Sequence, residues 1–428
     1  MQQTTFQFPK SFLWGTATSS HQVEGNNTCN QWWAWEQQEG RILQGHKSGQ
    51  ACDWWGGRWQ EDFERAAAAY QNTHRLSLEW SRIQPTPQKW DMESLHYYRQ
   101  MLQGLRQRGM TPMVTLHHFS DPLWLAEQGG WENPLVVQWF AAYVKKVIEV
   151  LGDQSSLWVT INEPNVYATL GYVMGDFPPG KKDMRVAYRV LVNMVKAHAE
   201  AYHIIHKIKP MVRVGFALNI QHFMPANIAS PFDRWAARLQ NKLFNESFLH
   251  ALVDGVFRFA VFNTRIPSAV GTQDFIGLNY YTTSLVAFDI RKPGELFGRR
   301  FFSPDALLSE TKFIACVPQG FYHALAWANT FGLPIIVTEN GVEDSQDKFR
   351  QHYLLTHIHQ MGKAMQEGMP IQGYYHWSLV DNFEWERGWT QRFGLWELDM
   401  ETQVRRSRPS MDVFASICKT NEVLVSNP

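Results

Sequence analysis

Two glutamates stand where strand-like stretches of the sequence end. Glu163 follows Trp158–Ile161, a β-branched and aromatic run that Pro164 terminates. Glu339 ends a second apolar run, Leu333–Thr338. Because the carboxyl ends of parallel strands meet at one face of an α/β fold, the two side chains are expected to lie in one site. A pair of carboxyls in one site is typical of glycoside hydrolysis.

A carboxyl pair permits two kinds of displacement at a glycosidic bond. A retaining enzyme holds the two groups about 5–5.5 Å apart, and an inverting enzyme holds them about 6.5–9.5 Å apart with a water between them. Spacing along the chain leaves both open. A nucleophilic carboxylate must stay ionised, and Arg75 on another strand-like stretch is the candidate to stabilise it by charge and hydrogen bonds.

Each of these residues also has a purely structural interpretation. A glutamate at a strand end can cap a helix or pair with arginine, and Arg75 could belong to a core ion pair. The asparagine beside each glutamate favours a functional role. His117 and His118 could bind a metal, but no third ligand stands at suitable spacing, so no metal and no cofactor are expected.

The composition excludes several function classes. The chain has 428 residues with 40 basic and 40 acidic side chains, which gives no electrostatic argument for a nucleic-acid partner. Four cysteines without a CxxC spacing indicate neither a disulfide framework nor a zinc site. Neither a signal peptide nor an 18-residue apolar run is visible, so a cytoplasmic protein without membrane association is expected.

Strand-like and helix-like patterns alternate along the whole chain. The eight expected strands begin near Phe12, Thr73, Thr111, Trp158, Val212, Asp274, Leu333 and Gly373. Helical spacing lies between them, including a helix that starts at Asn133-Pro134 and another over Trp235–Leu252, whereas Trp32–Trp55 and Arg291–Thr311 are expected as loops. The pattern predicts an α/β fold, a single (β/α)₈ TIM barrel with elaborated βα loops over residues 1–428.

Several separate motifs resemble one known family. They are Phe12-Leu-Trp-Gly-Thr-Ala-Thr-Ser-Ser-His-Gln-Val-Glu-Gly25, Arg75-Leu-Ser-Leu-Glu-Trp-Ser-Arg-Ile83, Thr160-Ile-Asn-Glu-Pro164, Gly277-Leu-Asn-Tyr-Tyr281, Thr338-Glu-Asn-Gly341 and Trp377-Ser-Leu-Val-Asp-Asn-Phe-Glu-Trp385. Together and in this order, they make the chain resemble glycoside hydrolase family 1, the β-glucosidase and β-galactosidase family of retaining barrel enzymes. The resemblance runs from about Phe8 to Phe414.

The resemblance implies roles for the carboxylates and their neighbours. Glu163 would be the acid/base and Glu339 the nucleophile. Tyr281 and Arg75 would keep the nucleophile ionised and oriented, and Asn279 would support the carboxylate pair.

The resemblance also implies a sugar-binding set. Its members are Asn162 at the 2-hydroxyl, Gln22, His118, Glu384 and Trp385 at the 3-, 4- and 6-hydroxyls, Trp377 beneath the ring and Phe393 near the 6-position. Relatives that accept 6-phosphosugars have a small residue in place of Glu384, whose charge would repel a phosphate. A phospho-glycosidase is therefore disfavoured.

The resemblance weakens on the leaving-group side, where Phe119, Asn219 and Ile314 are expected. The family usually has Trp at the positions of Phe119 and Ile314, so a flat platform for a second sugar is missing. The predicted function is a retaining exo-β-glycosidase that hydrolyses terminal β-D-glucosyl residues, and also β-D-galactosyl or β-D-fucosyl residues, of a small-molecule glycoside or oligosaccharide. A transglycosidase and a non-catalytic sugar-binding relative are the alternatives.

Overall fold

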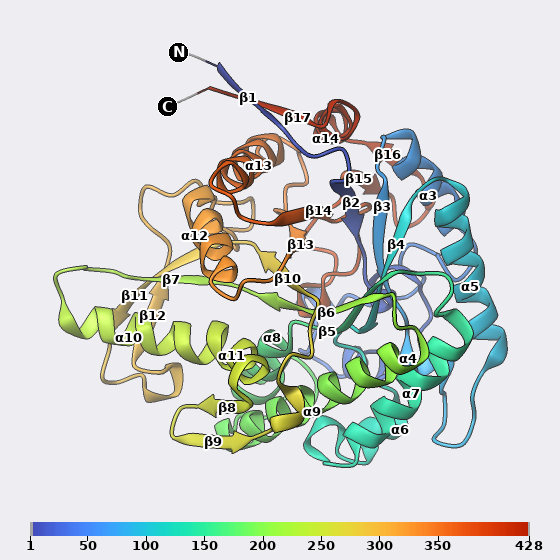
Figure 1. Ribbon diagram of the computed structural model, residues 1–428, viewed down its shortest axis with the longest axis horizontal. Coiled ribbons are helices and arrows are strands. Elements are labelled where there is room, and N and C mark those ends of the chain that lie inside the picture. The colour runs from blue at the N-terminus through green and yellow to red at the C-terminus, as the bar shows by residue number, and fades with distance from the viewer. Residues whose placement is uncertain (1–2, 427–428) are drawn as a thin grey trace.

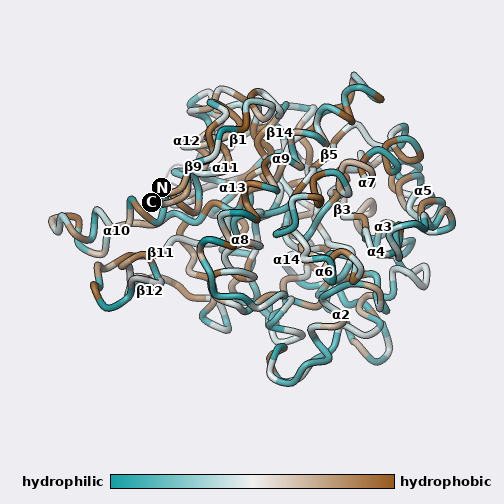
Figure 2. Tube along the Cα trace, turned by 90° about the horizontal axis from the view of Figure 1, so that it is seen from below, coloured by the Kyte–Doolittle hydropathy of each residue, from teal (hydrophilic) through white to brown (hydrophobic). Residues whose placement is uncertain are grey.

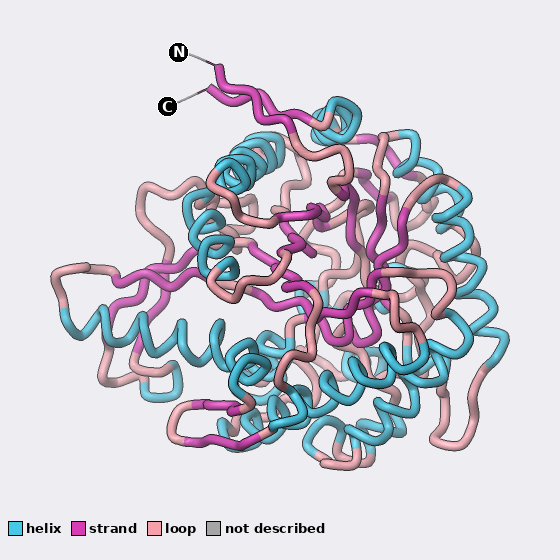
Figure 3. The backbone as a smooth tube through the Cα atoms, viewed as in Figure 1, coloured by secondary structure: helices cyan, strands magenta, loops and turns pink. Residues whose placement is uncertain are grey.

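A closed barrel of eight parallel strands forms the centre of the computed structural model, which describes residues 3–426. In order around the barrel these are β2 (Leu13–Ala17), β3 (Thr73–Ser77), β4 (Thr111–His117), β5 (Leu157–Asn162), β6 (Arg213–Asn219), β10 (Phe275–Tyr280), β13 (Ile335–Asn340) and β14 (Ile371–Trp377). Figure 3 shows these strands at the centre with the helices outside them. The barrel predicted from the alternating pattern is confirmed.

The longer helices lie outside the barrel. They are α3 (Trp59–Ala68), α5 (Met92–Gln107), α7 (Val136–Leu151), α9 (Met184–Ile208), α10 (Pro231–Asn241), α11 (Ser247–Asp254), α12 (Pro318–Asn329), α13 (Arg350–Gln366) and α14 (Pro409–Thr420). In α7, Phe140, Tyr143, Val144 and Val147 are fully buried at spacings of three and one, which is one face of a helix. Hydrophobic and hydrophilic residues accordingly alternate along the outer helices (Figure 2).

Short elements occupy the connections. The helices are α1 (Ser20–Val23), α2 (Gln31–Glu36), α4 (Trp80–Ile83), α6 (Leu123–Glu127) and α8 (Pro164–Thr169), and the strands outside the barrel are β1 (Gln3–Gln7), β7 (His222–Pro225), β8 (Val256–Phe259), β9 (Phe262–Arg265), β11 (Thr283–Phe288), β12 (Gly298–Phe301), β15 (Trp396–Leu398), β16 (Arg405–Ser407) and β17 (Glu422–Ser426). Strands β7, β11 and β12 form a small sheet that projects sideways with α10 (Figure 1).

Two predicted helix boundaries are wrong. Helix α7 begins at Val136 rather than at Pro134, because Asn133 caps a preceding turn by accepting from the Leu135 amide at 3.0 Å. The single helix expected over Trp235–Leu252 begins at Pro231 and is divided into α10 and α11 by a π-helical turn at Lys242–Glu246. Hydrophobic periodicity does not register such a turn.

Two segments predicted as loops contain regular structure. In the tryptophan-rich segment, α2 begins where the Asn30 side chain accepts from the Trp33 amide at 2.8 Å. Within Arg291–Thr311, β12 pairs antiparallel with β11, and Phe301 lies opposite Leu285. The basic composition of the segment conceals the strand.

The two ends of the described chain lie side by side. Strands β1 and β17 pair antiparallel, with Gln3 opposite Ser426 (Figure 1). This pairing, which sequence periodicity did not predict, leaves the opposite, carboxyl-terminal face of the barrel for the residues described next.

Candidate active site

Glu163 lies at the carboxyl end of β5, where the backbone turns sharply. Its φ of 44° is in the left-handed region, which few residues with a side chain adopt. Pro164, the first residue of α8, disfavours the right-handed conformation before it. The Glu163 amide donates to the Ala217 carbonyl of the next strand at 2.8 Å, which fixes the turn.

Glu339 occupies the carboxyl end of β13, and its flanking residues are fixed by close packing. The Asn340 side chain donates to the Tyr280 carbonyl at 2.7 Å. A Cβ atom at Gly341 would lie 2.0 Å from the Trp377 carbonyl oxygen, so only glycine fits beside the neighbouring strand. The side chain of Glu339 is thereby directed from a rigid strand end.

Arg75 and Tyr281 both contact the Glu339 carboxyl. Arg75 Nη1 lies 2.5 Å from Oε1, and the Tyr281 hydroxyl donates to Oε2 at 2.6 Å. Arg75 is itself fixed, because its Nε donates to the Thr115 hydroxyl at 3.0 Å and its Nη2 to Asn162 Oδ1 at 2.7 Å. Both oxygens of Glu339 therefore accept hydrogen bonds, an arrangement that stabilises the ionised form.

Two asparagine side chains contact Glu163. Asn279 Nδ2 and Asn219 Nδ2 donate to Oε1 at 2.8 and 2.9 Å. Thr338 orients Asn279 by donating to its Oδ1 at 2.6 Å, and Asn279 also donates to Asn162 Oδ1 at 3.2 Å. Through Asn162 and Asn279, one continuous network joins the surroundings of Glu163 to the arginine on Glu339.

The two carboxyls have different electrostatic environments. Burial and then the negative charge of Glu339 raise the pKa of Glu163 to about 8. Burial also raises the pKa of Glu339, but Arg75 and the hydroxyl of Tyr281 oppose that effect. Glu163 is therefore the member of the pair that holds a proton at neutral pH, as a general acid must.

Both glutamates line one cavity of about 300 Å³. Five predicted sugar-binding residues line it and are called its inner wall: Trp377, Trp385, Glu384, His118 and Phe393. The three residues predicted on the leaving-group side also line it and are called its outer wall: Phe119, Asn219 and Ile314. The remaining predicted residues, Gln22, Arg75, Asn162 and Asn279, are fully buried and hydrogen-bond to members of this wall. The structure thus brings together all the site residues predicted from the sequence.

Polar and aromatic groups alternate in the inner wall. The His118 ring stacks near Trp377 and Trp385, with centroids 5.8 and 6.0 Å away. Gln22 Nε2 donates to Glu384 Oε2 at 3.0 Å and to Asn382 Oδ1 at 2.9 Å. Indole faces beside carboxylate and amide groups suit a molecule with an apolar ring face and peripheral hydroxyls.

Three supporting residues were not predicted from the sequence. Thr115 and Thr338 orient Arg75 and Asn279, and Asn382 accepts from Gln22. The signal available was position: Thr338 adjoins Glu339, and Thr115 lies on the strand that ends at His117.

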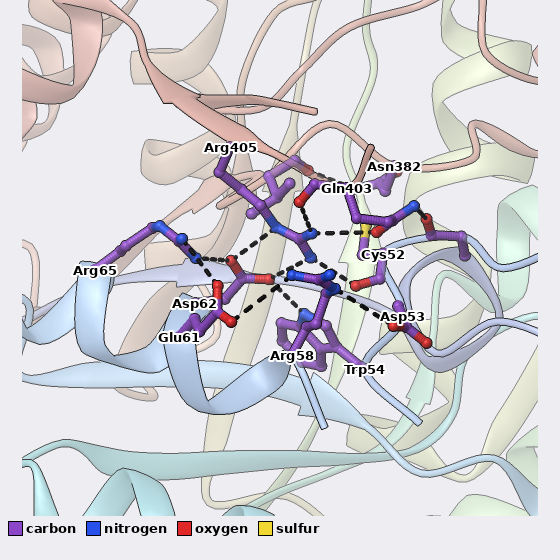
Figure 4. A network of polar contacts seen from close by, with 12 residues as sticks. Cys52, Asp53, Trp54, Arg58, Glu61, Asp62, Arg65, Asn382, Gln403 and Arg405 are labelled. Atoms are coloured by element: carbon purple, nitrogen blue, oxygen red, sulfur yellow. Dashed lines mark hydrogen bonds and ion pairs between the residues drawn. The ribbon is translucent and has the colours of Figure 1, made fainter. Parts of the chain in front are cut away.

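A buried ion pair supports this wall from outside the barrel. Arg405 of β16 lies 3.0 Å from Asp62 of α3 and also donates to the Cys52 carbonyl at 2.6 Å (Figure 4). Cys52 Sγ lies 3.3 Å from the Asp381 carbonyl, next to Asn382. Through Cys52, the ion pair of Arg405 and Asp62 is connected to the segment that carries Glu384.

His117 does not face the cavity as a metal ligand would. Its Nε2 lies 2.9 Å from Asp121 Oδ1, in a buried contact. Over the described residues, no group of three or more His, Cys, Asp and Glu side chains is arranged to hold a metal ion. Within residues 3–426, no helix has the length and apolar character needed to cross a membrane.

Comparisons with known proteins agree with this geometry. The family model for Glycosyl hydrolase family 1 matches residues 4–423. Beta-glucosidase A of Thermotoga maritima is 33% identical over 97% of this chain and 98% of its own, and a beta-galactosidase of Pyrococcus woesei is 30% identical over 97% and 98%. The solved structure of a beta-glycosidase from Pyrococcus horikoshii superposes with a TM-score of 0.92 at 37% identity, covering 98% of this chain and 96% of that one. The resemblance predicted from the motifs is confirmed.

Proposed function

The chain belongs to glycosyl hydrolase family 1 and is an exo-acting β-glycosidase, and we propose that it releases terminal β-D-glucosyl residues with Glu339 as nucleophile and Glu163 as acid/base. The observation that carries this assignment is the unequal environment of the two carboxyls in one cavity. Arg75 and Tyr281 stabilise one as the anion, and burial beside that anion keeps the other protonated.

In the first step, a Glu339 oxygen attacks the anomeric carbon while the bond to the leaving oxygen breaks. Glu163 transfers its proton to that oxygen, so the aglycone leaves as a neutral alcohol or phenol. The product is an α-linked glycosyl ester of Glu339. Asn162, oriented by Arg75 at 2.7 Å, is placed to bond the 2-hydroxyl, a contact that strengthens in the transition state.

In the second step, water replaces the aglycone. Once Glu339 is esterified its charge is gone, so the pKa of Glu163 falls from its raised value of about 8. The resulting Glu163 carboxylate removes a proton from water, whose oxygen attacks the anomeric carbon and releases Glu339. Two inversions leave the sugar in the β configuration.

The remaining inner-wall residues account for recognition of the terminal sugar. Trp377 supplies an apolar face for the pyranose ring, and Glu384 with Gln22 supplies acceptor and donor groups for its hydroxyls. His118, Trp385 and Phe393 complete the wall. Burial, followed by the charges of Glu386 and Glu339, raises the pKa of Glu384 well above its usual range.

The relatives include both beta-glucosidases and a beta-galactosidase. We infer glucosyl as the principal specificity, with galactosyl and fucosyl residues also accepted. Relative kcat/KM values on aryl β-glucoside, β-galactoside and β-fucoside measure this preference. The single-domain organisation over residues 1–428 and the cytoplasmic location remain predictions.

Substitution Glu339→Gly tests the central assignment. Turnover of 4-nitrophenyl β-glucoside should fall by more than about 10⁴-fold, because no covalent intermediate can form. Azide should restore activity by entering the space of the lost carboxylate, and the product should be the inverted α-glucosyl azide. Retained hydrolysis in Glu339→Gly would refute the nucleophile.

A matched control for that experiment is Glu343→Gln. Glu343 is buried four residues further along the same segment, where the Thr311 hydroxyl donates to it at 2.7 Å. The amide keeps an oxygen acceptor there, so ordinary activity is expected.

Measured hydrolysis by the unmodified chain would also eliminate the non-catalytic alternative.

A further inference from the structure

Two guanidinium groups line the active-site cavity, and they differ in their partners. Arg387 Nε lies 3.0 Å from Glu386 Oε1, and its guanidinium lies 5.0 Å from the centre of the Phe313 ring. Arg300, on β12, has no carboxylate within 4.0 Å among the described residues. Only the charge of Arg387 is therefore balanced by an adjacent carboxylate.

Arg300 is nevertheless held in a defined position. Its Nε donates to Gln240 Oε1 at 2.7 Å, and its guanidinium lies 4.7 Å from the centre of the Phe223 ring. Gln240 is fully buried, and its Nε2 donates to the Gly298 carbonyl at 3.3 Å, so its oxygen is presented to the arginine. The hydrogen bond to Gln240 uses Nε. Among the described residues, neither Nη1 nor Nη2 of Arg300 has a hydrogen-bond partner.

Arg300 is an exposed residue of β12 whose guanidinium has no carboxylate beside it in the described part of the chain, so an anion can pair with it without displacing another. The surrounding protein lowers its pKa to about 10, and Glu295 partly opposes the effect, so the guanidinium is charged at neutral pH. A guanidinium with two terminal nitrogens available matches the two oxygens of a carboxylate, in a charge-assisted, bidentate geometry. The position is fixed in advance, so little side-chain entropy is lost on binding.

Apolar side chains share the cavity with Arg300. Phe244, Phe302, Phe313 and Ile314 all line it. Ile314 is 1% exposed and fills the wall where a flat indole would have offered a platform for a second sugar. The walls therefore suit an aryl ring more closely than a second pyranose.

We propose that the leaving group recognised by this protein is an aryl aglycone bearing a carboxylate, with the ring among Phe244, Phe302 and Ile314 and the carboxylate paired with Arg300. The proposal rests on the proposed function, because it identifies what departs from the sugar. Glu163, Glu339 and Glu384 line the same cavity. Since like charges repel, the carboxylate should stand on the far side of the ring from the glycosidic oxygen.

The test compares two substrates that differ in charge and by one methyl group. They are the β-glucosides of 3-(4-hydroxyphenyl)propanoate and of its methyl ester. The two-carbon spacer insulates the phenol from the acid group, so the leaving groups have nearly the same intrinsic reactivity. The kcat/KM for the acid should exceed that for the ester by at least about tenfold, the value expected of a charged hydrogen bond.

Two neighbouring arginines provide the variant and its control. In Arg300→Met, the ratio of acid to ester should fall to about one. Arg299 is the adjacent residue of β12 and is exposed like Arg300, but its side chain points to the other face of the strand. Its guanidinium lies 5.4 Å from the centre of the Phe301 ring, and Arg299→Met should keep the ratio of the unmodified chain.

Each outcome decides the proposal. A ratio at or below one in the unmodified chain, which needs no variant, overturns it. A high ratio that survives Arg300→Met also overturns it, and so does failure to hydrolyse either substrate while 4-nitrophenyl β-glucoside is hydrolysed. If 4-nitrophenyl β-glycosides are not hydrolysed at all, the proposed function itself is wrong and the inference falls with it.

Discussion

Arg75 Nη1 lies 2.5 Å from Glu339 Oε1, although 264 positions separate the two residues in the chain. Both side chains are buried, and the arginine also bonds Asn162. The contact joins β3 to β13 across the interior of the barrel. A buried charge pair that is also hydrogen-bonded to a third group holds both partners in one geometry. A reacting carboxylate requires such a fixed position.

Removing Arg75 should change the pH dependence of the reaction. Arg75 lowers the pKa of Glu339, so that pKa should rise in Arg75→Met and the acidic limb of kcat/KM should move upward by at least about one pH unit. Arg213→Met is the control. Arg213 lies at the opposite end of its strand, bonded to Gln372 at 2.7 Å, and its loss should leave the acidic limb in place. A uniform fall in kcat/KM without a shifted limb would contradict the assignment.

The substitution Glu163→Ala should separate good from poor leaving groups. An activated dinitrophenolate departs without a proton, whereas an alkyl alcoholate needs one, so glycosylation should slow by about 10²–10⁴-fold more for the alkyl glucoside. Azide should attack the accumulated intermediate and give the β-glucosyl azide, the opposite anomer to that from Glu339→Gly. Equal losses on both substrates would argue against an acid role for Glu163.

The raised pKa of Glu163 should depend on the charge of Glu339. That charge adds to burial in raising the pKa to about 8, so neutralising it in Glu339→Gln should lower the value. Titration of carbon-13-labelled glutamate by NMR measures the change directly. The control is Glu384→Gln, a carboxylate in the same cavity wall that should leave the Glu163 titration nearly unchanged. An unshifted Glu163 in Glu339→Gln would show that the two carboxyls are not coupled.

The ion pair of Arg405 and Asp62 should matter for stability. Both side chains are fully buried, and Arg405→Met leaves Asp62 paired, among the described residues, only with Arg65 at 2.8 Å, so the free energy of unfolding should fall by about 1.5–3 kcal/mol, the value of a lost hydrogen bond to a charged group. Arg406 provides the comparison, since its side chain is 57% exposed and lies 3.9 Å from Glu397. Arg406→Met should cost under about 1 kcal/mol. Urea unfolding of the two variants distinguishes these outcomes.

Much of the site was predictable because its residues occupy special places in local patterns. Glu163 and Glu339 interrupt apolar runs, and the polar groups around them lie at or just after other strand ends. A parallel barrel collects those ends at one face, so strand order alone brings these residues to one place. Element types followed from periods of two and 3.6, which short stretches of chain encode directly.

Other features left no periodic signal in the sequence. They include the β11–β12 pairing, the π-helical turn before α11 and the joining of the two chain ends by β1 and β17. The positions of Arg300 in the cavity wall and of Thr115 behind Arg75 are set by neighbours far along the chain. Side-chain type and spacing therefore determined the barrel and its carboxylate chemistry, whereas closure of the barrel decided which groups touch, because burial, pKa and hydrogen bonding are properties of the packed interior.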